Sequence, residues 1–351
     1  MIMDVDLINL RKQINSLINE SKRRAKKSEC IWCGTPVTSF CNSHSVPQCV
    51  IKNIEIDGKV GYYNTLVELP TMNLDKGINE AGTFKLLCRN CDNKLFKDYE
   101  DIERLKERPS DIMLAEIALK DILVMLNKRY IEVELQNVMS ESFNIPSNFN
   151  MNSQRRIKNL DLKDFGWEYL RTKSIIENNI ENSFNLLFWK KLDYVIPIAF
   201  QGQVVLYGDL EGNIVSDIYD YSETNIVKNL HICLFPLKED SVVFMFYHKE
   251  DHAYDAFSKQ FNMLDDSQKL QLIGYILYER CEDMLFAKKF PHRTWILNRI
   301  SELFISTPDV HMVTKETEEY YKKQSLYRLK YRDISFPNIL ESRFAFKQKT
   351  E

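Results

Sequence analysis

Two pairs of cysteines, each with two residues between the partners, constrain this chain more than any other feature of its sequence. Cys30 and Cys33 form the first pair, and Cys88 and Cys91 form the second. Thiolates spaced in this way can grip one metal ion, and four of them match the closed tetrahedral environment of structural zinc. Gly34 lets the backbone turn directly behind the first pair. The sequence therefore predicts a structural Zn²⁺ site formed by all four cysteines.

The other cysteines do not suggest a disulfide framework. The chain has 351 residues and eight cysteines, and six of these fall within its first 91 residues. Cys41 and Cys49 could replace one of the four thiolates, although packing is the simpler interpretation. Cys233 and Cys281 stand alone in apolar surroundings, which is typical of buried core residues. With no secretory signal pattern and no apolar run long enough for a membrane span, a cytoplasmic location is expected.

The periodicity of the apolar residues predicts an α+β chain made of five segments. A basic N-terminal helix is expected over residues 1–27, followed by a zinc module over 28–102. A helical connector is expected at 103–136, and an Asn- and Ser-rich linker at 137–160. Residues 161–351 are expected to form a larger α+β domain of four or more strands. Sensing, regulation and oligomerisation are the roles considered for this domain.

Turn signals and apolar runs place individual elements within this larger domain. The expected elements are a helix at 175–189, a hairpin of strands 194–200 and 203–207, strands at 231–237 and 241–247, and helices at about 252–263 and 267–289.

A basic run precedes the first cysteine pair. Seven basic residues and a single acid, Glu20, lie between Arg11 and Lys27, although the formal net charge of the chain is -3. Such a local patch on a nearly neutral chain suits a protein that contacts phosphate with one face, and a solvated helix face is the alternative interpretation. The residues predicted to bind nucleic acid are Lys22, Arg23, Arg24, Lys26 and Lys27.

Between the two cysteine pairs lies the stretch Asn42-Ser43-His44-Ser45-Val46-Pro47. The chain resembles the zinc-containing HNH (ββα-metal) endonuclease family in the order of its motifs. These are a Cys-x-x-Cys pair, then Ser-His-x-x-Pro, then a hairpin and Leu-Cys-x-x-Cys. The resemblance covers roughly residues 28–102. It implies a treble-clef or ββα-metal module whose zinc is structural, with a histidine at the end of the first strand as general base and one Mg²⁺ or similar ion nearby.

Carried over to this chain, the resemblance makes His44 the general base, because a neutral imidazole can accept a proton from water near pH 7. Ser43 stands where the family often has a metal-binding Asp or His. Asp92, directly after the second cysteine pair, would hold the catalytic Mg²⁺ or Mn²⁺. Asp98 and Glu100 lie further along the same helix and could assist, although a solvated face is the simpler interpretation.

The resemblance implies a metal-dependent endonuclease that hydrolyses the phosphodiester bonds of nucleic acid, with DNA favoured over RNA. Its build is similar to that of bacterial anti-phage defence effectors. The departures at Ser43, Asp92 and Thr83, which stands at the place of the family's central Asn, support a rival hypothesis. In this rival the chain is a zinc-dependent nucleic-acid-binding or adaptor protein that has lost catalysis. A third hypothesis makes the zinc module purely structural, with protein contacts made through residues 161–351.

Overall fold

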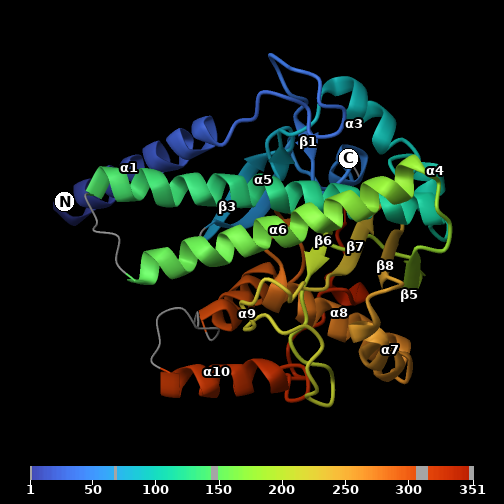
Figure 1. Cartoon of the computed structure of the whole chain (residues 1–351). Coiled ribbons are helices and arrows are strands. Elements are labelled where there is room, and N and C mark those ends of the chain that lie inside the picture. The colour runs from blue at the N-terminus through green and yellow to red at the C-terminus, as the bar shows by residue number, and fades with distance from the viewer. Residues whose placement is uncertain (1, 67–68, 144–148, 306–314, 348–351) are drawn as a thin grey trace.

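The computed structural model describes residues 2–66, 69–143, 149–305 and 315–347 (Figure 1). The α-helices are α1 (Ile2–Arg24), α2 (Gln48–Ile51), α3 (Arg89–Leu95), α4 (Ile102–Leu105), α5 (Asp111–Phe143), α6 (Phe149–Glu177), α7 (Asp255–Asn262), α8 (Asp266–Arg280), α9 (Arg293–Ile305) and α10 (Lys315–Tyr327). The strands are β1 (Ser43–His44), β2 (Lys59–Leu66), β3 (Leu69–Gly77), β4 (Thr83–Phe84), β5 (Phe184–Leu192), β6 (Ile198–Val204), β7 (Leu230–Pro236), β8 (Ser241–His248) and β9 (Asp283–Phe286). The helices and antiparallel strands form an α+β fold, as the sequence predicts.

A seven-stranded sheet forms the centre of the fold. Its strand order is β3-β2-β9-β6-β7-β8-β5, and each neighbouring pair is antiparallel. Every residue of β7 and β8 is buried. Strands covered on both faces read as continuous apolar runs, and this confirms the strands predicted at 231–237 and 241–247.

Helices cover both faces of the sheet. The long helices α5 and α6 lie side by side over one face, and α7 and α8 lie over the other (Figure 1). The side chains of β7 alternate between the two layers. Cys233 and Phe235 pack in the same apolar cluster as α5, whereas Ile232 and Leu234 pack with α7 and α8. The N-terminal helix α1 packs against α5.

The cysteine-rich region is joined to this sheet. Strands β1 and β4 form a separate two-stranded sheet, and between them the chain leaves to form α2, β2 and β3. Strand β2 then pairs with β9, with Gly61 opposite Phe286. A Cβ atom at Gly61 would come within 2.1 Å of the Phe286 ring. Residues of the 28–102 region and of the 161–351 region therefore contribute strands to one sheet.

The prediction of a linker at 137–160 is wrong for the residues of this segment that the structure describes. Helix α5 continues to Phe143 and α6 begins at Phe149, while residues 144–148 lie outside the described part of the chain. The segment lacks strong apolar periodicity. Its helices form because α5 and α6 pack along each other, and tertiary packing supplies most of the stability of helices in proteins.

Three further expectations are wrong. The helix predicted at 175–189 ends at Glu177, and strand β5 follows. The hairpin expected to turn at Gln201-Gly202 is instead the single strand β6. The helix predicted at 267–289 ends at Arg280, and β9 follows it. Among the described residues, no helix combines the length and the apolar character that crossing a membrane requires.

Candidate functional site

The four predicted zinc ligands come together in one cluster. The Sγ atoms of Cys30, Cys33, Cys88 and Cys91 all lie within 4.8 Å of one another. Four sulfurs bound tetrahedrally at a Zn–S distance of about 2.3 Å are about 3.8 Å apart, so the observed cluster fits this ion. Cys30 and Cys91 are buried, Cys88 is partly buried and Cys33 is exposed. The cluster can therefore hold a structural zinc ion.

Short backbone contacts arrange the two cysteine pairs. Gly34 has a φ of 68°, and its N–H donates to the Cys30 carbonyl, which closes the turn behind the first pair. Cys88 is the N-cap of α3, and its Sγ accepts from the N–H of Cys91 at 3.5 Å. The N–H of Cys88 donates to Sγ of Cys30 at 3.3 Å, which links the two pairs. Backbone N–H groups aimed at sulfur favour the thiolate form that a metal needs.

Cys41 and Cys49 do not belong to this cluster. Sγ of Cys41 lies 3.2 Å from Oδ2 of Asp92, and Sγ of Cys49 lies 3.7 Å from the Glu100 carbonyl oxygen. Burial is the main cause that raises the pKa of both thiols, Cys41 to about 11. Both side chains therefore carry neutral thiols near pH 7.

His44 lies in β1, opposite Thr83 of β4. Its Nε2 atom lies 2.9 Å from the carbonyl oxygen of Ile78. A carbonyl only accepts, so Nε2 carries the proton and Nδ1 keeps its lone pair when the ring is neutral. Partial burial, with repulsion from Lys120, lowers the pKa of His44 below its usual value. The imidazole is therefore neutral near pH 7, which is the state a general base requires.

Asp92 stands in the first turn of α3 and faces β1. Its Oδ1 accepts a hydrogen bond from the Ser43 hydroxyl at 2.5 Å, and its Oδ2 contacts Cys41. Cys88, and not Asp92, caps the helix. The carboxylate of Asp92 is thus oriented toward β1, the strand that carries His44. Its contact on that strand is Ser43, the residue before His44.

The structure does not assemble a complete second cation site. Among the described residues, the four cysteines are the one group of three or more His, Cys, Asp or Glu ligand atoms close enough to share an ion. Asp92 and the Ser43 hydroxyl supply two oxygen donors. Mg²⁺ often takes only one or two carboxylates from a protein and completes its shell with water and substrate phosphate. These two donors fit such an ion as a partial site.

Several contacts around His44 come from residues outside the predicted set of site residues. Asn79 follows Ile78 and fixes this turn, because its backbone carbonyl accepts from Asn42 at 2.8 Å and its side-chain oxygen accepts from Gln48 at 2.7 Å. No motif marks this turn in advance, since its three contacts depend on how the chain returns between β3 and β4.

An ion pair between a buried lysine and an exposed glutamate also lies near His44. Lys120 of α5 pairs with Glu100, and the Lys120 side chain is only 2% exposed. Its ammonium lies 4.1 Å from the centre of the Phe96 ring. Both charges act on the pKa of His44, Lys120 lowering it and Glu100 raising it. Glu100 therefore influences His44 through its charge. Asp98 instead forms an ion pair with Arg104.

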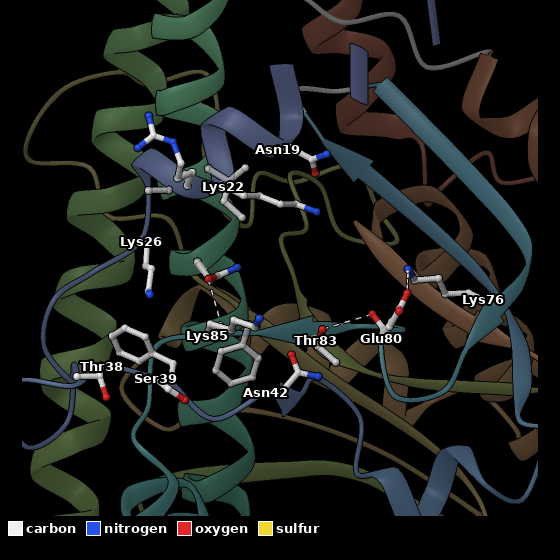
Figure 2. Close-up of a pocket in the computed structure, with 16 residues that line it drawn as sticks. Asn19, Lys22, Lys26, Thr38, Ser39, Asn42, Lys76, Glu80, Thr83 and Lys85 are labelled. Atoms are coloured by element: carbon white, nitrogen blue, oxygen red, sulfur yellow. Dashed lines mark hydrogen bonds and ion pairs between the residues drawn. The ribbon is translucent and has the colours of Figure 1, made fainter. Parts of the chain in front are cut away.

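A basic cavity of about 660 Å³ adjoins this region (Figure 2). It is bounded by the C-terminal half of α1, the segment 38–42, the end of β3, strand β4 and part of α5. Figure 2 shows Lys22, Lys26 and Lys85 around the hollow. Asn42 and Thr83 also line the cavity. Asn42 is the residue before Ser43, and Thr83 is the β4 residue that lies opposite His44 of β1.

The basic run divides into two groups. Lys22, Arg23 and Lys26 line the cavity. Arg24 instead forms ion pairs with Glu20 and Glu141, and the ammonium of Lys27 lies 3.5 Å from the centre of the Tyr130 ring. The structure therefore brings three of the five predicted nucleic-acid-binding residues to the hollow, and it adds Lys76 and Lys85 from elsewhere in the chain.

Comparison of the chain with known protein families, with curated proteins and with solved structures gives no match. The resemblance to HNH endonucleases therefore depends on the sequence motifs alone, and the four-cysteine cluster is compatible with a zinc module.

Proposed function

We propose that this chain is a metal-dependent endonuclease of the HNH type, with nucleic acid as substrate and DNA favoured over RNA. One observation carries the proposal. Strand β1 carries Ser43 beside His44, Ser43 hydrogen-bonds Asp92 of α3, and the adjoining residues Asn42 and Thr83 line a basic cavity. Zinc at the four cysteines would hold the strands and the helix together and would take no part in the chemistry.

In this proposal, His44 takes a proton from water at Nδ1, while Nε2 stays bound to the Ile78 carbonyl. The oxygen of that water attacks phosphorus, the bond from phosphorus to the leaving 3′ oxygen breaks, and that oxygen takes a proton from solvent. Asp92 and Ser43 would hold one Mg²⁺ or Mn²⁺. The bound cation would neutralise charge on the scissile phosphate. Lys22, Lys26 and Lys85 would bind flanking phosphates.

A second candidate function is supported by the contacts of Asp92. Both of its oxygens are already engaged, one by Ser43 and one by Cys41, and no third ligand stands ready among the described residues. A zinc-dependent protein that binds nucleic acid without cleaving it would have the same fold and the same basic cavity. Cleavage therefore separates the two candidates.

The test compares cleavage of supercoiled DNA by the parent protein, Asp92→Asn and Asp98→Asn, each with Mg²⁺ or Mn²⁺. A bound cation contributes several kcal/mol at the transition state, so we expect Asp92→Asn to lose about a hundredfold or more in rate. Asp98→Asn should cleave like the parent, because Asp98 is paired with Arg104 and contacts neither Ser43 nor Asp92 in the described structure. Equal rates for the parent and Asp92→Asn would remove Asp92 from the site, and absence of cleavage by the parent would favour the second candidate.

A further inference from the structure

The cavity beside His44 carries an excess of positive charge. Five cationic side chains and one carboxylate line it. Lys76 is paired with that carboxylate, Glu80, and Arg23 is paired with Glu20 on its own helix. The remaining three cations, Lys22, Lys26 and Lys85, form no ion pair with any residue that the structure describes.

Lys22 is repelled by two other lysines of the hollow. Partial desolvation and the charges of Lys76 and Lys85 lower the pKa of Lys22. Exposed cations gathered around one hollow raise its positive potential, so the arrangement favours a bound anion such as phosphate. Lys22, Lys26 and Lys85 come from two segments far apart in the sequence, the region around the end of α1 and the residue that follows β4.

The cavity also offers groups that recognise a base. Phe40 is half-buried and lines the hollow, so that part of its side chain is available for stacking. Aromatic side chains beside a cationic groove are the usual means by which proteins hold unpaired bases. The amides that also line the cavity, which can donate and accept hydrogen bonds at a base edge, are those of Asn19, Asn42 and Asn127.

The position of the cavity relates it to cleavage. Asn42 immediately precedes β1, and Thr83 is the β4 partner of His44. A strand whose phosphodiester lies at His44 can thus continue into the hollow. The volume of about 660 Å³ lies within the usual range for pockets that hold one small molecule, which is the scale of a single nucleotide.

We propose that this cavity holds one unpaired nucleotide of the substrate strand, with its phosphate on Lys22, Lys26 and Lys85 and its base against Phe40. The substrate class is therefore single-stranded or locally unpaired nucleic acid. This inference depends on the nucleic-acid-binding part of the proposed function, but it does not require that the chain cleave its ligand.

The test measures binding by fluorescence anisotropy without added divalent cation, using a short labelled single-stranded DNA and the blunt duplex of the same sequence. We expect the single strand to bind about tenfold more tightly. Phe40→Ala should lose about tenfold in affinity for the single strand and leave duplex affinity unchanged, whereas Phe40→Tyr should restore the preference. Lys85→Ala should lower the salt dependence of single-strand binding by about 0.7 in logarithmic slope. Lys259→Ala, an exposed lysine on α7, is the matched control.

Equal affinity for the two DNAs, no binding of either, or an unaltered preference in Phe40→Ala would each overturn the nucleotide site. Cleavage of duplex DNA by such a protein would leave the proposed nuclease function intact. Conversely, a Phe40-dependent preference for single strands in a protein that never cleaves would support the site and reject the nuclease. The two failures are therefore distinguishable.

Discussion

At the residue scale, His44 is held through Nε2 by a carbonyl that lies 34 residues further along the chain. Its pKa is also influenced by Lys120 on α5. The sequence could point to His44 because Ser-His-x-x-Pro stands between the cysteine pairs. It could not point to the Ile78 carbonyl or to Lys120, because neither has a recognisable spacing from the motif. What can be predicted at this scale is the residue with distinctive chemistry, and not the contacts that position it.

The cysteine cluster gives a prediction of its own. Cys88→Ser should reduce bound zinc from about one atom per chain to nearly none and lower the melting temperature, because structural zinc contributes directly to folding. Cys49→Ser is the matched control, since Cys49 lies outside the cluster and contacts the Glu100 carbonyl. Zinc content measured by atomic absorption decides the matter. Full zinc in Cys88→Ser would show that the four thiols are not the ligands.

At the element scale, sequence periodicity identifies α1, β7 and β8 but fails where burial and tertiary contacts dominate. The run in β5, Phe184–Leu192, is apolar enough to suit either a buried helix or a strand, and pairing with β8 decides between them. The polar start of α6 has no clear helical period in the sequence. It is helical in the structure because it packs along α5. β9 has only four residues and directly follows α8, so no separate period marks it.

Helix α5 carries a buried acid that makes stability depend on pH. Glu116 is 3% exposed, and its Oε2 accepts from the N–H of Tyr99 at 3.0 Å. Burial, with the nearby charge of Asp98, raises the pKa of Glu116 from 4.5 to about 8. Between these two pKa values, Glu116 keeps its proton in the folded protein and loses it in the unfolded chain. This contribution is complete at low pH and is lost as pH rises through about 8.

Glu116→Gln keeps an acceptor for the Tyr99 N–H and cannot ionise. We expect the melting temperature of the parent to fall relative to that of Glu116→Gln as pH rises from about 5 to about 9. Thermal unfolding of both proteins across this range measures the effect. A constant difference between the two melting temperatures would mean that Glu116 is ionised at all these pH values in the folded protein.

At the scale of the whole molecule, the cysteine-rich region is continuous with the rest of the fold. Cys30, Ala81 and Phe84 belong to the same apolar cluster as Ile117 of α5 and Phe235 of β7. Strand β2 adds the pairing with β9. The α+β class can be predicted from the periodicity of the sequence. The sharing of one sheet by strands from distant parts of the chain cannot, because pairing partners leave no local pattern.

This continuity predicts that residues 28–102 do not fold alone. Their apolar faces lie against α5 and β9, so the isolated segment would expose them to water. We expect the segment, even with zinc, to lack a cooperative thermal transition by circular dichroism, whereas the full chain shows one. A cooperative transition in the isolated segment would mean that its contacts with α5 and β9 are dispensable.

The most direct test of the proposed function is nicking of supercoiled plasmid DNA with Mg²⁺ or Mn²⁺ by the parent, His44→Ala and His252→Ala. His252 is an exposed histidine paired with Asp255, which makes its variant the matched control. All three proteins must retain equal zinc. We predict that His44→Ala loses about 10²- to 10⁴-fold in rate, as expected for removal of a general base, and that His252→Ala cleaves like the parent. Cleavage by His44→Ala at the parent's rate would contradict the proposed site.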